Sequence, residues 1–189
     1  MFSEQYLKDL AGALEQFPHE AFETMIARML EAYQAGRRIF TMGNGGSAST
    51  ASHWACDINK GCSYGLDRRF RMMCLNDSLP TMMAYANDVS YDAVFVEQLR
   101  NFFEPGDVVI GISGSGNSPN VLNAIQYASD NQGVTVGLSG YSGGKLAGMV
   151  QVPLVARVDD MQKVEDVHMI VVHMSMQRIG QALGLLPVI

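Results

Sequence analysis

Apolar residues recur every three or four positions through the first 35 residues of the chain. This spacing predicts a helix over residues 3–16 and a second helix over residues 19–34. Pro18 separates the two, at a position where a helix start tolerates proline, and Gly36 is placed to end the second helix. We expect these leading helices, within residues 1–35, to cover a sheet or to form an interface between copies of the chain.

Short apolar runs alternate with helical patterns through the rest of the chain. Strands are predicted at 38–42, 72–75, 108–110, 134–138 and 150–155. Helices are predicted from the glycine-rich loop at 43–48 through about residue 60, from Ser78 to a break at 86–90, over 91–102, over 119–129 and over 161–183. A short turn and helix is predicted at 142–146. Such alternation is typical of right-handed βαβ units. The sequence therefore predicts an α/β fold, a three-layer sandwich whose mainly parallel sheet is flanked by helices.

Length and composition indicate one globular domain. The 189 residues contain no internal repeat, low-complexity tract or linker, so we expect a single domain over residues 1–189. No apolar run approaches the roughly 20 residues that a membrane span needs, and the N-terminus has no signal-like segment. We expect no membrane association and a cytoplasmic location.

Charge and cysteine content exclude further classes of protein. The net charge is −6, and the basic residues are scattered apart from a short cluster at Arg68, Arg69 and Arg71, so nucleic acid is not an expected partner. The three cysteines are odd in number and lack paired C-x-x-C spacing. We expect reduced, mostly packed cysteines, with neither a disulfide framework nor a cysteine zinc site.

A loop rich in glycine and serine, Gly111–Asn120, follows a buried strand and precedes a helix. Ser113, Ser115 and Ser118 offer hydroxyls, and small neighbours let backbone N–H groups approach a ligand. The N-terminus of the next helix favours negative charge. This combination predicts a phosphate-binding loop rather than an ordinary turn.

A second glycine loop, 43–48, follows the first predicted strand. Its spacing satisfies a loose dinucleotide fingerprint, but Asp77 lies too far along the chain for the usual acidic partner, and no Walker A lysine pattern occurs. We therefore expect no nucleotide cofactor. Both loops lie at the carboxyl ends of strands, where α/β sheets bind ligands, and a phosphate monoester held by Ser47 and the serines of the later loop uses both.

Two predicted helices carry titratable side chains on otherwise apolar surfaces. His53 and Asp57 are four residues apart and share a helix face. Glu165, His168 and His173 interrupt the closing helix. We expect His168 to be a hydrogen-bonded core residue, because a lone histidine on an apolar helix face usually is.

Four motifs occur in the order seen in sugar isomerase (SIS) domains, and the match spans nearly the whole chain. The motifs are Gly-Asn-Gly-Gly-Ser at 43–47, Ala-Asn-Asp at 86–88, Gly-Ile-Ser-Gly-Ser-Gly-Asn-Ser-Pro-Asn-Val at 111–121 and Gly-Gly at 143–144. Within this superfamily the chain resembles the phosphoheptose isomerases, which convert sedoheptulose 7-phosphate to an aldoheptose 7-phosphate. The resemblance implies a helix-flanked parallel sheet and a homotetramer with sites shared between subunits.

The resemblance also implies a catalytic set on the two helices. The family's histidines correspond to His53 and His173, while its glutamate and glutamine correspond to Asp57 and Glu165; in some members these positions bind zinc. We therefore expect His53, Asp57, Glu165 and His173 to be candidate ligands of one divalent metal, with zinc as the expected ion. The chain departs from the family pattern at Asp57, Gly114, Gln162 and Glu165.

Isomerisation through an enediol needs a base near the substrate carbon and an acid near its oxygens. Asp57, or Glu165 if the shorter aspartate does not reach, is the expected base, and His173 the expected acid. The expected substrate-binding residues are Asn44, Gly45, Gly46, Ser47, Asp88, Ser113, Gly114, Ser115 and Ser118.

Two alternatives stay open from the sequence. One is a non-catalytic SIS domain that binds a sugar phosphate or a protein partner, which the departures from the family pattern make credible. The other is an isomerase of a different sugar phosphate, because the number of carbons in the sugar that binds depends on the depth of the pocket.

Overall fold

The structure is a computed structural model that describes residues 1–187 of the chain. A five-stranded parallel sheet forms its centre, in the order β2-β1-β3-β4-β5. The strands are β1 (Arg38–Gly43), β2 (Arg71–Cys74), β3 (Val108–Ser113), β4 (Val134–Gly140) and β5 (Val152–Ala156). The helices are α1 (Phe2–Glu15), α2 (His19–Ala35), α3 (Gly46–Cys56), α4 (Leu79–Asp88), α5 (Val96–Phe102), α6 (Pro119–Asp130), α7 (Gly144–Met149) and α8 (Met161–Ala182).

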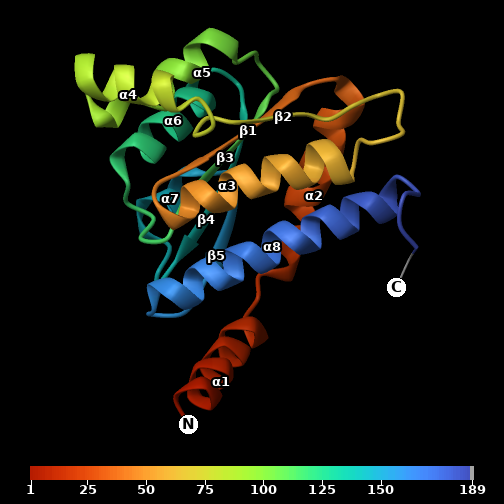
Figure 1. Cartoon of the computed structure of the whole chain (residues 1–189), viewed down its shortest axis with the longest axis vertical. Coiled ribbons are helices and arrows are strands. Elements are labelled where there is room, and N and C mark those ends of the chain that lie inside the picture. The colour runs from red at the N-terminus through yellow and green to blue at the C-terminus, as the bar shows by residue number, and fades with distance from the viewer. Residues whose placement is uncertain (188–189) are drawn as a thin grey trace.

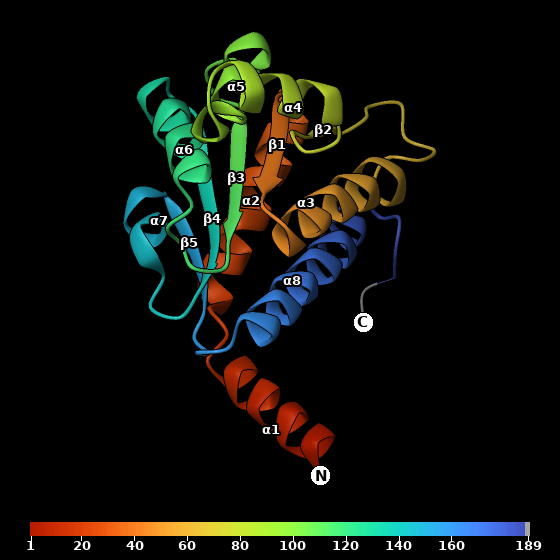
Figure 2. The same cartoon turned by 60° about the vertical axis from the view of Figure 1, so that its left-hand side comes forward.

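Helices cover both faces of the sheet, which confirms the predicted α/β sandwich. Helices α2, α3 and α8 pack on one face, while α5, α6 and α7 cover the other (Figure 1, Figure 2). The central strands β1 and β3 are buried along almost their whole length, as expected of strands covered on both faces. Ile39 and Ile110 point into the first layer, and Phe40 and Val109 into the second.

Three predicted elements differ in detail from the structure. The helix after the first glycine loop ends as an α-helix at Cys56 and continues as a π-helical turn, Asp57–Gly61. The predicted helix over 91–102 is divided into a 3-10 turn, Tyr91–Ala93, and α5. Helix α4 continues through Asp88, later than expected, because the N–H groups of Val89 and Ser90 both still bond the Tyr85 carbonyl.

Within residues 1–187, no helix combines the length and the apolar character needed to cross a membrane.

The order of the strands creates a crevice between β1 and β3. These two strands are neighbours, yet the helices that follow them leave toward opposite faces, α3 to one side and α6 to the other. Such a reversal separates the loops beyond the carboxyl ends of the strands and is where open α/β sheets bind ligands. Both glycine loops therefore flank one crevice.

Helix α1 extends away from the rest of the molecule (Figure 1). Its buried apolar contact is made near its end, where Leu10 and Leu14 pack against Val164 and Val167 of α8. Nearer its start, the Tyr6 hydroxyl donates to Asp166 at 2.6 Å. The first turns of α8 thus hold α1, while most of the α1 surface stays exposed.

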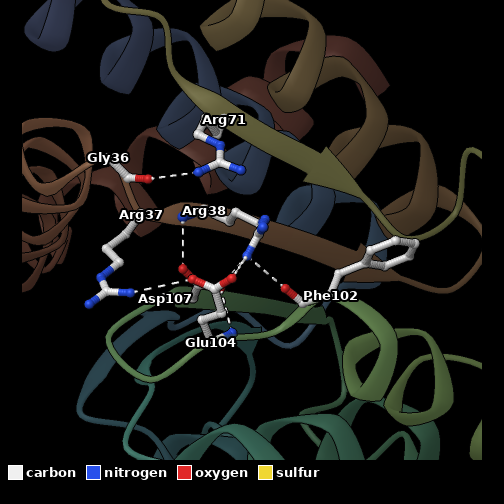
Figure 3. A network of polar contacts seen from close by, with 7 residues as sticks. All are labelled: Gly36, Arg37, Arg38, Arg71, Phe102, Glu104 and Asp107. Atoms are coloured by element: carbon white, nitrogen blue, oxygen red, sulfur yellow. Dashed lines mark hydrogen bonds and ion pairs between the residues drawn. The ribbon is translucent and has the colours of Figure 1, made fainter.

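The opposite, amino-terminal edge of the sheet is held by a buried carboxylate (Figure 3). Asp107, at the start of β3, accepts hydrogen bonds from the backbone N–H groups of Arg38, at 2.8 Å, and Glu104, at 2.9 Å. The Arg38 guanidinium pairs with Glu104 at 3.1 Å and donates to the Phe102 carbonyl. Asp107 therefore joins β1 to the chain that enters β3.

Replacing Asp107 with alanine should lower the free energy of unfolding by about 3 kcal/mol, because the change leaves the backbone N–H groups of Arg38 and Glu104 without their acceptor. Urea denaturation measures this loss. The control is Glu31→Ala, which removes only a surface ion pair with Arg28 and should cost less than about 1 kcal/mol. Equal, small losses in both variants would contradict the assigned role of Asp107.

Candidate active site

A reciprocal pair of amide hydrogen bonds joins the two glycine loops. The Asn44 and Asn120 side chains each donate to the other's oxygen at 2.9 Å, and the Tyr91 hydroxyl donates to Asn44 at 2.8 Å. Asn120 is buried and its oxygen also accepts from the N–H of Val121. The loop after β1 and the N-terminus of α6 are therefore held at a fixed separation.

The serines of the later loop surround a cavity of about 310 Å³ at the crevice. The Ser113 and Ser118 hydroxyls are 3.0 Å apart, so both face the same point. The lining residues are Asn44, Gly45, Gly46, Ser47, Ile112, Ser113, Gly114, Ser115, Ser118, Met161 and Glu165. This cavity, called the cradle below, brings together the predicted substrate-binding residues other than Asp88.

Hydrogen bonds to neighbouring elements fix the shape of the serine loop. The Gly114 carbonyl accepts from the N–H of Gly140 and the Gly116 carbonyl from that of Leu146. The Asn117 side chain accepts from the N–H of Lys145 and donates to the Ser115 carbonyl. The loop is thus pre-shaped by its own chain, as an anion-binding loop needs to be.

Helices α3 and α8 lie side by side and run in the same direction (Figure 2). At their N-termini, a Cβ atom added to Gly46 would lie 2.6 Å from the Glu165 carboxyl carbon, so the Glu165 side chain occupies the space that a side chain at position 46 would need. About two turns further along, His53 of α3 meets His173 of α8. The two helices therefore stay in register over this length.

His53, Asp57 and His173 form one compact group in the groove between α3 and α8. The His53 Nε2 atom lies 3.3 Å from His173 Nε2 and 3.3 Å from Asp57 Oδ2. One ligand atom of each residue lies within 4.8 Å of the other two. Asp57 is half-buried and both histidines are exposed, so the group is open to a ligand. Asp57 also begins the π-helical turn, a distortion common at functional sites.

The Cα atoms of Gly46 and Glu165, at the cradle, lie about 10–12 Å along the helix axes from those of His53 and His173. His53 follows Gly46, and His173 follows Glu165, by about two turns each, at a rise of about 1.5 Å per residue. Glu165 lies at the cradle end of this interval, against the N-terminus of α3. The two helices thus carry the cradle at their N-termini and the group formed by His53, Asp57 and His173 about two turns further along.

The structure separates two predicted residues from the rest. Glu165 lines the cradle and lies outside the group formed by His53, Asp57 and His173. Asp88 is exposed at the end of α4, where it accepts from the Asn87 side chain, and it does not line the cradle.

Sequence reasoning did not single out three residues that shape this site, namely Tyr91, Asn120 and Met161. The asparagine lay at the end of the recognised loop, but its partner is 76 positions away. Met161 resembled any apolar residue at a helix start. Its role in shaping the cradle is visible only from its position in the structure.

His168 is buried in the core, as expected, and points away from solvent. Its Nε2–H donates to the Ser139 carbonyl at 3.1 Å, since a carbonyl only accepts, and its Nδ1 atom has no partner among the described residues. Burial lowers the pKa of His168 from 6.5 to about 4, although the Ser139 hydrogen bond opposes this shift. His168 is therefore neutral at pH 7 and joins α8 to β4.

Comparison with known proteins agrees with this geometry. The family model for the SIS domain matches residues 5–140. The phosphoheptose isomerase of Geobacter sp. (strain M21) is 32% identical over 166 residues, covering 87% of this chain and 85% of that protein. The phosphoheptose isomerase of Helicobacter pylori is 35% identical over 171 residues, covering 90% and 84%.

A solved structure gives the same result. The phosphoheptose isomerase GmhA of Neisseria gonorrhoeae superposes with a TM-score of 0.84 at 27% identity, covering 96% of this chain and all of that chain. The protein therefore belongs to the SIS domain family, and among its relatives are phosphoheptose isomerases. The resemblance inferred from the glycine loops is confirmed.

The neutral state of His168 makes folding sensitive to acid. Its folded pKa lies below the unfolded value, so its contribution is complete above pH 6.5 and is lost as the pH falls toward 4, by up to about 3 kcal/mol. Urea denaturation at pH 7 and pH 4 should show a smaller acid-induced loss in His168→Gln, whose amide can still donate to Ser139. An equal loss in both proteins would contradict the assignment.

Proposed function

We propose that this protein is an aldose–ketose isomerase that converts sedoheptulose 7-phosphate into an aldoheptose 7-phosphate. The observation that carries the proposal is the fixed separation between a serine-lined cradle and the group formed by His53, Asp57 and His173. The relatives named phosphoheptose isomerase support the same substrate class.

The cradle supplies what a phosphate monoester requires. The Ser47, Ser113, Ser115 and Ser118 hydroxyls donate to its oxygens, and the N-termini of α3 and α6 favour its negative charge. Asn44, Gly45, Gly46 and Gly114 bring backbone and amide groups to the adjoining part of the sugar. Asp88 is assigned to orienting hydroxyls, and its distance from the cradle requires that it do so from a neighbouring subunit or after movement of α4.

The extended length of the substrate is close to the distance between the cradle and the group formed by His53, Asp57 and His173. An extended carbon chain advances about 1.25 Å per bond, so about 9 Å separates phosphorus from C2 in a seven-carbon ketose 7-phosphate. The corresponding distance in a five-carbon ketose 5-phosphate is about 6 Å. With the phosphate in the cradle, the seven-carbon chain brings its carbonyl to within side-chain reach of His53 and His173, whose Cα atoms lie about 10–12 Å along the helices, while the five-carbon chain ends about 3 Å shorter.

Proton transfer can be assigned to the residues at the far end of the groove. The Asp57 carboxylate takes a proton from C1, which leaves an enediol across C1 and C2, and returns a proton to C2. His173 donates a proton to the C2 oxygen and takes one from the C1 hydroxyl. Glu165, nearer the cradle, is the second candidate base and lies beside the middle of the bound chain.

The donor set at this point also fits a divalent metal. Two imidazoles and one carboxylate within 4.8 Å match a three-ligand zinc site that keeps a position open for substrate. We propose His53, Asp57 and His173 as the ligands, with Glu165 as a further ligand only if its side chain turns away from α3. A bound zinc ion would polarise the substrate oxygens. An Nε2 atom that binds metal holds no proton, so the acid role of His173 describes the metal-free site.

We also propose that the protein acts as a single domain and assembles as a homotetramer. Large apolar side chains are exposed on α1, at Phe2 and Leu7, and on α4, at Leu79 and Met83, which supports contact between copies. A cytoplasmic location belongs to this proposal as well. The cysteines are free rather than disulfide-bonded within the described residues, which fits a reducing compartment.

His173→Ala and Asp57→Asn should each lower isomerase activity at least a hundredfold, because each removes a group that transfers a proton. Deuterium incorporation at C2 during turnover of sedoheptulose 7-phosphate measures the step directly. Glu165→Gln should lose less than tenfold, since it lies nearer the phosphate. Near-wild-type rates in His173→Ala and Asp57→Asn would refute the assignment, and binding without exchange in the wild type would favour a non-catalytic sugar-phosphate-binding domain.

Metal binding has its own measurement. Protein purified without chelators should hold about one zinc per chain by elemental analysis, and His53→Ala should hold less than a tenth of that amount. His168→Gln is the matched control, because His168 is buried and contacts none of the proposed ligands. A wild-type protein free of zinc, nickel, iron and manganese would contradict the proposed metal site.

A further inference from the structure

Gly114, the first residue of the serine loop after β3, lies directly against α8. A Cβ atom added to Gly114 would overlap the Met161 sulfur and lie 3.2 Å from the Met161 methyl carbon and 3.7 Å from Val164. Met161 therefore occupies the space that a side chain at position 114 would need. The two positions form a complementary pair, a glycine and a thioether, at one wall of the cradle.

Neither backbone at this contact is free to withdraw. Gly114 follows β3 directly and its carbonyl accepts from the N–H of Gly140 at 2.8 Å. Met161 is the first residue of α8, whose start is capped by Asp160 through the N–H of Lys163 at 3.2 Å. Lys163 also pairs with Asp160 at 2.6 Å, with its side chain almost fully buried. A change at position 114 must therefore be absorbed by the Met161 side chain.

Met161 is a half-buried, apolar member of a wall that is mostly polar. The cradle is lined by serine hydroxyls, the Asn44 amide and the Glu165 carboxylate, with Ile112 and Met161 as its apolar contributions. Met161 and Glu165 lie one turn apart on the same face of α8. The thioether thus closes the α8 side of the cradle beside the position of the phosphate.

We propose that Met161 is a specificity-determining residue that restricts the cradle to primary phosphate monoesters, with Gly114 supplying the space it needs. The inference rests on the proposed function and concerns one feature of the substrate, the branching of the carbon that carries the phosphate. A phosphate on a CH2 group passes the thioether. A phosphate on a branched carbon places a second substituent against it.

The proposal can be tested with two isomeric ligands that need no turnover. Glycerol 3-phosphate carries its phosphate on a terminal carbon and glycerol 2-phosphate on the branched middle carbon. Titration calorimetry on the full chain should show wild-type protein binding the first at least tenfold more tightly. In Met161→Ala the preference should fall below threefold, mainly through tighter binding of glycerol 2-phosphate.

A double-mutant cycle tests the pairing with Gly114. Gly114→Thr should weaken binding of glycerol 3-phosphate at least tenfold, because the new side chain pushes the thioether into the cradle. Gly114→Thr combined with Met161→Ala should recover affinity to within threefold of wild type. Met169→Ala is the control, since Met169 packs against the core on the same helix and does not line the cradle.

Full retention of the preference in Met161→Ala, or simple addition of the two effects in the double variant, would overturn the proposal. If Gly114→Thr does not fold by circular dichroism, Gly114→Ala replaces it in the cycle. Wild-type protein that binds glycerol 3-phosphate but exchanges no deuterium into sedoheptulose 7-phosphate would refute the proposed reaction and leave this inference supported. Absence of binding by wild-type protein to either glycerol phosphate would refute the inference itself.

Discussion

The parallel packing of α3 against α8 sets the distance between the cradle and the group formed by His53, Asp57 and His173. Gly46 allows the Glu165 carboxyl group to approach the start of α3, and two turns later His53 and His173 meet with 3.3 Å between their Nε2 atoms. Both helices begin beyond the carboxyl ends of their strands and lie on the same face of the sheet (Figure 2). In the proposed function, the start of each helix therefore contributes to the phosphate site, and its middle contributes to proton transfer. A shift of one helix by a single residue would separate the histidines.

Electrostatics and rigidity divide the groove into two ends. At the cradle, hydroxyls and helix N-termini attract an anion, and the Asn44–Asn120 pair holds the two loops together without a charged side chain. Glu165 is the one carboxylate that lines the cradle, and its negative charge would repel a phosphate dianion. This repulsion would limit how deeply the dianion enters the cradle. At the other end, imidazoles and a carboxylate are exposed to the groove, where they can reach a substrate. The buried His168 takes no part in this chemistry and instead keeps α8 attached to β4.

Local patterns in the sequence predicted most of the fold and part of the site. Helical and strand periodicity gave the α/β sandwich, and the position of both glycine loops after strands predicted one crevice. The four-residue spacing of His53 and Asp57 predicted their contact, because a single helix determines it. The contact of His53 with His173, 120 positions away, depends on how two helices pack and could be named only through family resemblance. Three further features follow from tertiary packing, so no local sequence pattern predicts them. They are the Asn44–Asn120 pair, the π-helical turn at Asp57 and the fit of Met161 to Gly114.

We propose that the packing of α3 against α8 selects the length of the phosphorylated sugar, and turnover of ketose phosphates with five, six and seven carbons tests this selection. With each compound at several concentrations, kcat/KM should rise with chain length and be at least a hundredfold higher for sedoheptulose 7-phosphate than for a five-carbon ketose 5-phosphate. The gain should appear mainly in kcat, because all members place the same phosphate in the same cradle. Equal values across the series, or a preference for the five-carbon compound, would contradict the claim.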